Sequence, residues 1–209
     1  MDASSPFKTA EQKVAERAAK RDAVLRAAVR MFNESGFFRT SLDDVAASLG
    51  ISKRTIYHYL SSKDQVLLEC VTIGLNQLLQ AAEEARRQPG SGRERLVAFL
   101  RRYAEINMED FGRCVIRTAE EMLADESRPR YVELKRAVDQ ALRVSVAEAV
   151  ADGSIAPVDV KLAAFTLAGA LNWPARWHRA DGDLSSAALA EAMVDLLMRG
   201  LEPDPAADR

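Results

Sequence analysis

The chain is poor in the residues that most enzymatic chemistry uses. Its 209 residues include two histidines and two cysteines. It has no glycine-rich phosphate loop, no nucleophile elbow and no spacing typical of metal ligands. An enzyme would have to use scattered carboxylates, and the adjacent Glu120 and Glu121 are typical of the solvated face of an amphipathic helix. We therefore predict no catalytic site, no metal site and no cofactor.

Long apolar runs are also absent. No stretch of eighteen apolar residues exists and no signal peptide opens the chain, so we expect a soluble, cytoplasmic protein. The two cysteines, Cys70 and Cys114, lie in apolar helical contexts, which favours buried reduced thiols over a disulfide or a redox sensor. A hydrophobic content of 48% is enough for a small domain plus a larger helical body with its own core.

The net charge of −2 conceals a division along the chain. Residues 1–60 carry ten Lys or Arg against seven Asp or Glu, whereas the rest carries nineteen against twenty-four. The sign of the net charge therefore changes from positive to negative. This division suits a docking face for phosphates in the N-terminal part and an acidic, soluble body behind it.

A helix-turn-helix pattern runs from Thr40 to Lys63. Ser41 can cap a first helix, and Asp44 follows three residues later, as in a capping box. Apolar residues then recur with helical spacing at Leu42, Val45, Ala46 and Leu49. Gly50 ends this helix because glycine tolerates the positive φ of a helix C-cap, and Ser52 opens the next helix.

The second helix of the pair carries more polar groups than packing requires. Only Ile56 and Leu60 are plainly apolar in it. The residues left for another surface are Lys53, Arg54, Thr55, Tyr57, His58 and Tyr59. A helix in the major groove needs donors for phosphates and base edges. We interpret this segment as a DNA-recognition helix; the alternative, a solvated charged face, leaves the exposed tyrosines without a use.

The same segment resembles the signature of the tetracycline-repressor (TetR) family over about residues 18–68. The matching motifs are Thr40-Ser41, Val45-Ala46, Leu49-Gly50-Ile51-Ser52, Thr55-Ile56-Tyr57-His58-Tyr59-Leu60 and Ser62-Lys63-Asp64. The resemblance implies DNA phosphate contacts by Tyr57, His58, Tyr59 and Lys63. It also implies that Thr40 and Ser41 hold the DNA backbone and that Ser52, Lys53, Arg54 and Thr55 face the groove.

Apolar periodicity and breakers predict an all-α fold with a small N-terminal domain and a larger C-terminal domain. We expect a flexible arm over 1–20, a three-helix DNA-binding domain over 21–65, a helical ligand-binding and dimerisation domain over 66–201 and a tail over 202–209. The arm is interpreted as a solvated terminus, with a minor-groove contact as the alternative. After Gly112, one helix is expected to place Val115, Ile116, Ala119, Met122 and Leu123 inward.

The last two predicted helices have an unusual surface. Between Val158 and about His178, small residues lie beside an apolar stripe and allow another helix to approach closely. Ser185 caps the final helix, which is also apolar on one side. In the TetR family two such helices from each subunit form a four-helix bundle, and a two-fold dimer suits a palindromic operator. The predicted interface residues are Leu162, Phe165, Gly169, Leu189, Met193 and Leu197.

The C-terminal part of the chain contains Leu171-Asn172-Trp173-Pro174-Ala175-Arg176-Trp177-His178-Arg179 and then Asp181-Gly182-Asp183-Leu184-Ser185. With these motifs, the region from about Val158 to Leu201 resembles TetR regulators of fatty-acid, steroid and aromatic-acid degradation, several of which sense acyl-coenzyme A thioesters. This resemblance implies a repressor that a small hydrophobic effector releases from DNA. The residues proposed to line an apolar pocket for the acyl group are Phe99, Tyr103, Phe111, Met122 and Tyr131. The residues proposed to bind the nucleotide end of coenzyme A are Trp173, Arg176, Trp177 and Arg179. Pro174 is expected to kink the helix that carries the tryptophans, near the pocket.

Three alternatives stay open at this stage. The tryptophans could pack the end of the helical bundle instead of binding a nucleotide. The effector could be a lipophilic drug, which would make the protein an efflux-type repressor. A DNA-binding protein without any effector would need no internal cavity.

Overall fold

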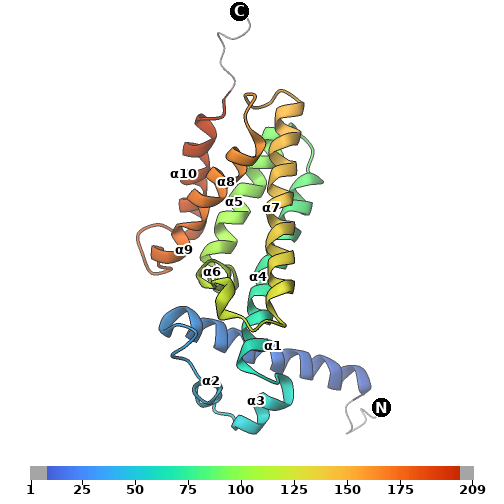
Figure 1. The fold of residues 1–209 in the computed structure, drawn as a ribbon, viewed down its shortest axis with the longest axis vertical. Coiled ribbons are helices and arrows are strands. Elements are labelled where there is room, and N and C mark those ends of the chain that lie inside the picture. The colour runs from blue at the N-terminus through green and yellow to red at the C-terminus, as the bar shows by residue number, and fades with distance from the viewer. Residues whose placement is uncertain (1–8, 203–209) are drawn as a thin grey trace, which may run out of the picture. The chain divides into compact units, whose positions relative to one another are not determined.

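The computed structural model describes residues 9–202, apart from the side chains of His58 and Tyr59 (Figure 1). Every regular element in this range is a helix, which confirms the predicted all-α fold. In chain order the elements are α1 (Ala10–Ser35), α2 (Leu42–Ser48), α3 (Lys53–Tyr59), α4 (Lys63–Arg86), α5 (Gly92–Met108), α6 (Asp110–Arg117), the short 3-10 helix η1 (Glu120–Met122), α7 (Arg128–Ala151), α8 (Val160–Asn172), α9 (Pro174–Trp177) and α10 (Ser186–Arg199). None of the helices in this range is long and apolar enough to cross a membrane.

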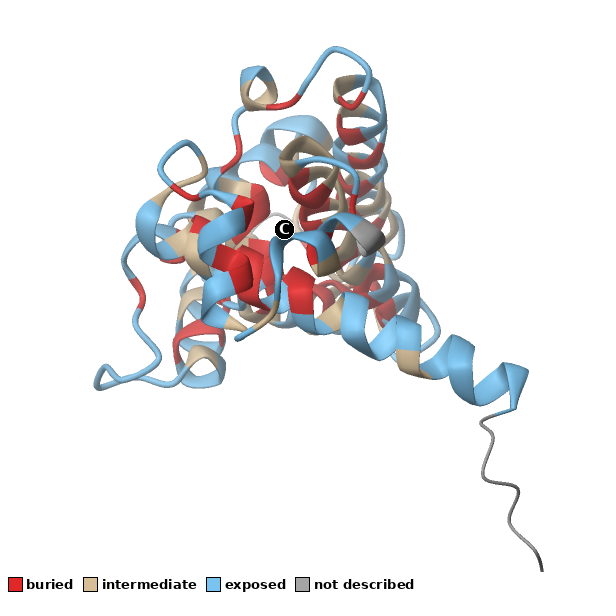
Figure 2. Cartoon of the chain, turned by 90° about the horizontal axis from the view of Figure 1, so that it is seen from below, coloured by how far each residue is buried: buried red, intermediate tan, exposed pale blue. Residues whose placement is uncertain are grey.

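The chain divides into two compact units, residues 1–69 and residues 70–209. The division falls within α4, close to the boundary that we predicted between residues 65 and 66. In both units, buried residues occupy the inward sides of the helices and exposed residues the outward sides (Figure 2). Each unit therefore has a core of its own.

The core of the N-terminal unit forms where α1, α2 and α3 meet. Helix α1 contributes the predicted apolar face of Leu25, Ala28, Val29 and Phe32, all of which are buried. Helix α2 buries Leu42, Val45 and Ala46, and the second helix of the pair is held by Ile56 and Leu60. The apolar positions that the sequence marks in the helix-turn-helix thus fix α2 and α3 against α1.

The N-terminus of α1 differs from the prediction. We expected a flexible arm over residues 1–20 outside the first helix, but α1 begins at Ala10, and Thr9 and Gln12 form a capping box at its start. The prediction is therefore wrong for residues 10–20, because a cap and good helix formers extend the helix even where nothing covers it. Residues 1–8 lie outside the described part of the chain, as do residues 203–209 of the predicted tail.

Helix α5 occupies the centre of the C-terminal unit and contacts α6, α7, α8, α9 and α10 (Figure 1). Its buried residues Leu96, Phe99, Leu100, Tyr103 and Ile106 form a stripe with helical spacing. The helix starts at a capping box of Ser91 and Glu94. Burial of this stripe by five neighbouring helices is the main apolar contribution to this unit.

The segment after Gly112 also differs from the prediction. The expected single helix is broken: α6 ends at Arg117, and η1 follows only after Thr118 and Ala119 have adopted extended backbone angles. Consequently Ala119 is exposed and Met122 is only half-buried. At Pro174, where we expected a kink, the structure has a break: α8 ends at Asn172 and Pro174 opens the separate helix α9.

Gly112 is a position where the close packing of α5 and α6 leaves no room for a side chain. An added Cβ would collide with the carbonyl oxygen of Ile106 and would lie 3.0 Å from the Cα of Asn107. We expect Gly112→Ala to lower the free energy of unfolding by about 1–3 kcal/mol, because backbone must move to accept the methyl group. Thermal unfolding at one fixed protein concentration measures this change.

Gly200→Ala is the matched control for this substitution. Its added Cβ would meet only the carbonyl oxygen of Leu197, at an ordinary 3.5 Å, and its backbone is in the right-handed helical region. We expect the control to leave the unfolding temperature nearly unchanged. Equal effects of the two substitutions would contradict the described contact between α5 and α6.

Candidate nucleic-acid interface and ligand cavity

The start of α2 is fixed by the capping box that the sequence predicts. The Ser41 hydroxyl accepts a hydrogen bond from the Asp44 N–H at 3.1 Å, and the Asp44 carboxylate accepts one from the Ser41 N–H at 2.8 Å. The hydroxyl of Ser41 also donates to this carboxylate, and these bonds lower the pKa of Asp44. Ser41 is exposed, but its side chain is already used in capping.

Thr40 has a different position from the one that the resemblance implied. It is only 2% exposed, and its hydroxyl donates to the carbonyl oxygens of Gly36 at 3.0 Å and Met31 at 3.3 Å. The hydroxyl of Thr40 is therefore used within the fold, and a DNA contact by Thr40 stays a prediction that does not involve this group. Without these carbonyls the buried hydroxyl of Thr40 would have no hydrogen-bond partner. The same two bonds hold the loop before α2 against the end of α1.

Helix α3 has a buried side and a polar exposed side. Ser52 caps the helix, because its hydroxyl accepts a hydrogen bond from the Thr55 N–H at 3.2 Å. Ile56, on the inward side of the helix, is fully buried. Lys53, Arg54 and Tyr57 are exposed. The side chains of His58 and Tyr59, for which we predicted phosphate contacts, lie outside the described part of the structure. The exposed side of α3 thus presents cations, hydroxyl groups and one aromatic ring, as a base-reading helix requires.

The cations at this surface differ in how they are held. Lys53 Nζ lies 2.9 Å from an Asp43 carboxylate oxygen, and this hydrogen bond raises the pKa of Lys53. Arg54 is exposed and has no hydrogen-bond or ion-pair partner among the described residues. An exposed pair such as Lys53–Asp43 stabilises the fold little, so both cations can be offered to DNA, Arg54 without first losing a partner.

Lys63, the first residue of α4, sits at a helix start that is itself suited to an anion. Its Nζ lies 4.2 Å from the centre of the Phe37 ring, and partial burial lowers its pKa. The Ser62 hydroxyl accepts a hydrogen bond from the Gln65 N–H at 3.1 Å. Helix N-termini attract anions, and the Phe37 ring holds the ammonium group beside this one. Nothing in the spacing of the sequence links residue 37 to residue 63, so Phe37 was missed.

The C-terminal unit contains a cavity of about 250 Å³ among α4, α5, α6, α7 and α8. Most of its wall is apolar, with Leu75 and Leu78 from α4 and Val138 and Leu142 from α7. Tyr103 is the one residue among our five pocket predictions that lines it. The cavity has the apolar lining and few polar groups that are typical of small-molecule sites.

The other four pocket predictions lie elsewhere. Phe99 is fully buried and packs edge to face on Tyr103, with 5.9 Å between ring centres, so it belongs to the core. Phe111 and Tyr131 are also buried in the core, and Met122 is on η1. None of these four lines the cavity, because helical spacing identifies inward residues but does not separate those in the core from those at a cavity wall.

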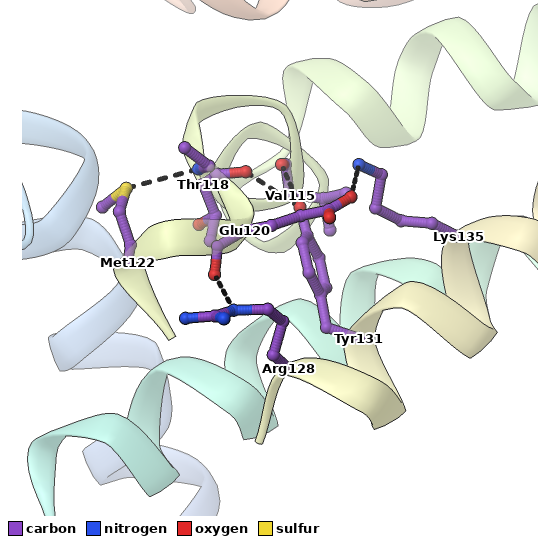
Figure 3. Close-up of polar contacts among 8 residues, drawn as sticks. Val115, Thr118, Glu120, Met122, Arg128, Tyr131 and Lys135 are labelled. Atoms are coloured by element: carbon purple, nitrogen blue, oxygen red, sulfur yellow. Dashed lines mark hydrogen bonds and ion pairs between the residues drawn. The ribbon is translucent and has the colours of Figure 1, made fainter. Parts of the chain in front are cut away.

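Tyr131 closes the link between α6 and α7 (Figure 3). Its hydroxyl lies 2.9 Å from the Thr118 carbonyl oxygen and 3.2 Å from that of Val115, and burial raises the pKa of this hydroxyl. Arg128 Nε donates to the Glu120 carbonyl at 3.2 Å, and Lys135 Nζ pairs with the Glu120 carboxylate at 3.0 Å. These bonds satisfy the carbonyls left free where α6 ends, so this cluster is structural.

Both cysteines are buried and unbridged, as predicted. Burial raises the pKa of the Cys114 thiol to about 11. Thiolate is the reactive form of cysteine, so Cys114 is suited to packing and not to redox chemistry. Among the described residues, no cluster of histidine, cysteine, aspartate or glutamate is placed to hold a metal ion.

The four residues predicted for a nucleotide surround α9. Trp173 is 61% exposed and Trp177 is 49% exposed, so the tryptophans do not pack inside the end of the bundle. Arg176 is exposed, and Arg179 is paired with Asp181 at 2.9 Å. None of the four lines the cavity, although Asn172, the residue before Trp173, does.

The outward sides of α8 and α10 carry most of the predicted interface. Leu162 and Phe165 are exposed large apolar residues, Gly169 is exposed, and Met193 and Leu197 are half-buried. Leu162 and Leu197 also line a shallow groove of about 370 Å³. Leu189 lies on the inward side of α10 and is buried within the unit, so it is not part of the exposed surface predicted as the dimer interface. Leu196, which is exposed, is on the outward side.

Two family models match the chain. The model described as "Bacterial regulatory proteins, tetR family" matches residues 24–70, and the model described as "Tetracyclin repressor-like, C-terminal domain" matches residues 89–201. Among curated proteins, the HTH-type transcriptional repressor KstR2 of Mycolicibacterium smegmatis is 26% identical over 187 residues. This alignment covers 88% of the chain and 91% of KstR2.

Solved structures with this fold include two transcriptional regulators. PfmR, a TetR family regulator from Thermus thermophilus, matches with a TM-score of 0.78 and 32% identity over 86% of this chain and 98% of its own. AibR, solved in complex with isovaleryl coenzyme A and operator DNA, matches with a TM-score of 0.74 over 84% of this chain and 96% of its own. At 24% identity the likeness to AibR shows the fold alone.

The geometry of the exposed cations predicts two different effects on DNA binding. Lys63→Met keeps the packing on Phe37 but removes the charge, so we expect it to weaken specific and nonspecific binding alike. A phosphate contact carries no sequence information, and its loss should make the plot of log K against log salt concentration less steep by about one. Arg54→Ala is expected to cost about 1–3 kcal/mol at particular base pairs.

Titrations of a selected duplex and a scrambled duplex at several salt concentrations separate the two effects. Arg26→Ala is the matched control, because Arg26 is an exposed cation on α1 that already pairs with Asp22 at 2.7 Å. We expect the control to leave both affinities nearly unchanged. Unaltered binding profiles for both Lys63→Met and Arg54→Ala would contradict the interface.

Proposed function

Because the chain belongs to the TetR family of bacterial transcriptional regulators, we propose that it represses transcription as a dimer and that a small acyl-coenzyme A thioester releases it from DNA. The observation that carries the DNA-binding part is the exposed side of α3, where Arg54 has no partner among the described residues and Lys63 lies at the next helix start. These groups supply donors for base edges and phosphates. No step of this activity is enzymatic.

The dimer is supported by the apolar residues that folding leaves exposed on α8 and α10. Leu162 of α8 is 67% exposed, and it lines the same shallow groove as the half-buried Leu197 of α10. Exposed apolar residues gathered in one patch mark an interaction surface. A second copy of the chain can bury this patch with two-fold symmetry, which places two α3 helices on a palindromic operator.

The acyl-coenzyme A class is supported by the size and lining of the cavity. A volume of about 250 Å³ is below the range of about 300–1,000 Å³ that is usual for drug-sized ligands. This favours a short acyl group over the lipophilic drugs of an efflux repressor. The fold relative AibR was solved with isovaleryl coenzyme A, which is a thioester of this size class.

Two cations near the cavity are an alternative to Arg176 and Arg179, our first choice for binding the nucleotide end of coenzyme A. Phe165 lines the cavity, and its ring lies 5.1 Å from the Arg143 guanidinium carbon and 5.8 Å from Lys161 Nζ. Arg176 and Arg179 are not at the cavity wall. We therefore propose that Lys161 meets the phosphates of the coenzyme together with Arg143, whose guanidinium also pairs with Asp139 at 2.7 Å, since guanidinium and ammonium groups both bind phosphate.

Release from DNA requires that the effector bind two states of the dimer with different affinity. A ligand that binds the DNA-competent and the released dimer equally shifts nothing, however tightly it binds. The proposed effector therefore has to fit the cavity better in the released state. This makes operator release and ligand binding reciprocal, so operator DNA is expected to weaken acyl-coenzyme A binding.

The dimer is tested by placing a charge in the patch. We expect Leu162→Arg to yield monomers with poor operator affinity, because a guanidinium would be buried at the contact without a partner. Sedimentation velocity gives the oligomeric state, and a duplex titration gives the affinity. Val14→Arg is the control for sedimentation, since Val14 is 69% exposed but lies on α1. A Leu162→Arg protein that sediments as an unaltered dimer would point to another interface.

A further inference from the structure

Three polar side chains meet where α5 and α8 pack together. Asn172 Oδ1 accepts two hydrogen bonds, one from the Tyr103 hydroxyl at 2.9 Å and one from Asn107 Nδ2 at 2.9 Å. Tyr103 and Asn107 are buried, while Asn172 is half-buried and lines the cavity. The three residues form a small polar cluster in a wall that is otherwise mostly apolar.

The two bonds to one oxygen fix the orientation of the Asn172 amide. Because Oδ1 accepts from both donors, Nδ2 is left with no partner in the described part of the chain. On the other side of the cluster, Asn107 Oδ1 is buried and has no hydrogen-bond partner among the described residues. Asn107 does not line the cavity, so the unused group of the cluster that a molecule bound there can reach is Asn172 Nδ2.

The other polar groups at the cavity wall are already used. Tyr103 donates its only proton to Asn172, and burial raises the pKa of its hydroxyl, which keeps that proton in place at neutral pH. Lys135 is paired with Glu120 at 3.0 Å, and Asp139 is paired with Arg143 at 2.7 Å. Of the uncharged polar side chains that line the cavity in the described chain, Asn172 is thus the one that offers a donor without a partner.

The position of Asn172 on α8 suits a ligand with a neutral polar group inside a longer chain. Phe165, Ala168 and Asn172 all line the cavity and follow one another at i, i+3 and i+7, so they share one side of the helix. A ligand chain lying along Phe165 and Ala168 would bring a carbonyl group within that chain to the amide. The amide is neutral, and the charges at the wall are already paired, so a neutral acceptor fits better than a carboxylate.

We propose that the Asn172 amide, held in place by Tyr103 and Asn107, binds the carbonyl oxygen of the effector and selects a thioester over the corresponding free acid or thioether. This assignment rests on the proposed function, because it names the group that the same cavity recognises. Asn172 acts as the specificity-determining residue, and Tyr103 and Asn107 position it. Nδ2 donates one hydrogen bond to the carbonyl oxygen, and no covalent bond changes.

Two ligands that differ only in the carbonyl test the assignment. Hexanoyl-coenzyme A has the carbonyl oxygen, whereas the thioether S-hexyl-coenzyme A lacks it and keeps the chain and the coenzyme. Isothermal titration of the full-length protein gives both dissociation constants. We expect the thioester to bind between about two- and tenfold more tightly than the thioether, as one net hydrogen bond to a neutral group implies.

Asn172→Asp is the most informative variant because it keeps the acceptor for Tyr103 and Asn107 but removes the Nδ2 donor. We expect the dissociation constant of the thioether divided by that of the thioester to fall to about one or below one. Asn172→Leu, which removes the whole amide, should also bring the ratio to about one. Circular dichroism and sedimentation show that each variant is folded and dimeric like the parent.

Val138→Ala is the control at the cavity wall. It removes apolar contact and should weaken both ligands by a similar factor, so that their ratio stays at the parent value. Tyr103→Phe should lower the ratio without abolishing binding, because it frees the Asn172 amide to turn. A purely structural role for the cluster would weaken both ligands together and leave the ratio unchanged.

The outcomes separate the two proposals. Equal affinity of the parent protein for both ligands, or a ratio that survives Asn172→Asp, overturns the role of Asn172 while acyl-coenzyme A remains the effector class. If neither coenzyme A derivative binds, the effector class fails and the role of Asn172 fails with it. A preference for the thioester that disappears in both Asn172 variants supports the assignment.

Discussion

The structure of the C-terminal unit depends on the burial of α5. Five helices pack on it, and its apolar stripe from Leu96 to Ile106 is almost wholly withdrawn from solvent. Because one helix serves as the common core, its polar residues are forced into the interior as well. Tyr103 and Asn107 lie on the same helix as Phe99, and both meet Asn172 of α8. The packing that stabilises the unit is therefore also what places hydrogen-bonding groups at the cavity.

In both of the surfaces that we propose for binding, folding leaves selected polar groups without a partner. In the N-terminal unit, Thr40 and Ser41 are used by the fold, whereas the exposed Arg54 has no partner among the described residues. In the C-terminal unit, Lys135 and Asp139 are paired, whereas the Asn172 Nδ2 group has no partner in the described chain. A binding surface can be recognised by such unused donors, because a group already paired within the protein contributes less to a ligand.

The local parts of this structure were predictable from the sequence and the distant contacts were not. Ser41 with Asp44, Ser52 and Ser185 cap their helices as predicted, because a cap depends on residues within about four positions. The Tyr103–Asn172 and Asn107–Asn172 bonds join residues 69 and 65 positions apart, so no spacing rule could reveal them. For the same reason the sequence could not separate Tyr103, at the cavity wall, from Phe99 and Tyr131, in the core.

The central claim is that a short acyl-coenzyme A thioester releases this repressor from its operator. A duplex selected by the protein from a random pool provides the operator, and tryptophan emission from the exposed Trp173 and Trp177 reports on binding nearby. Titration of the complex with hexanoyl-coenzyme A, hexanoic acid and unrelated lipophilic drugs, followed by emission and by DNA release together, is the most direct measurement. We predict release by the thioester and not by the acid or the drugs. Release by drugs alone, or by none of these compounds, would contradict the account.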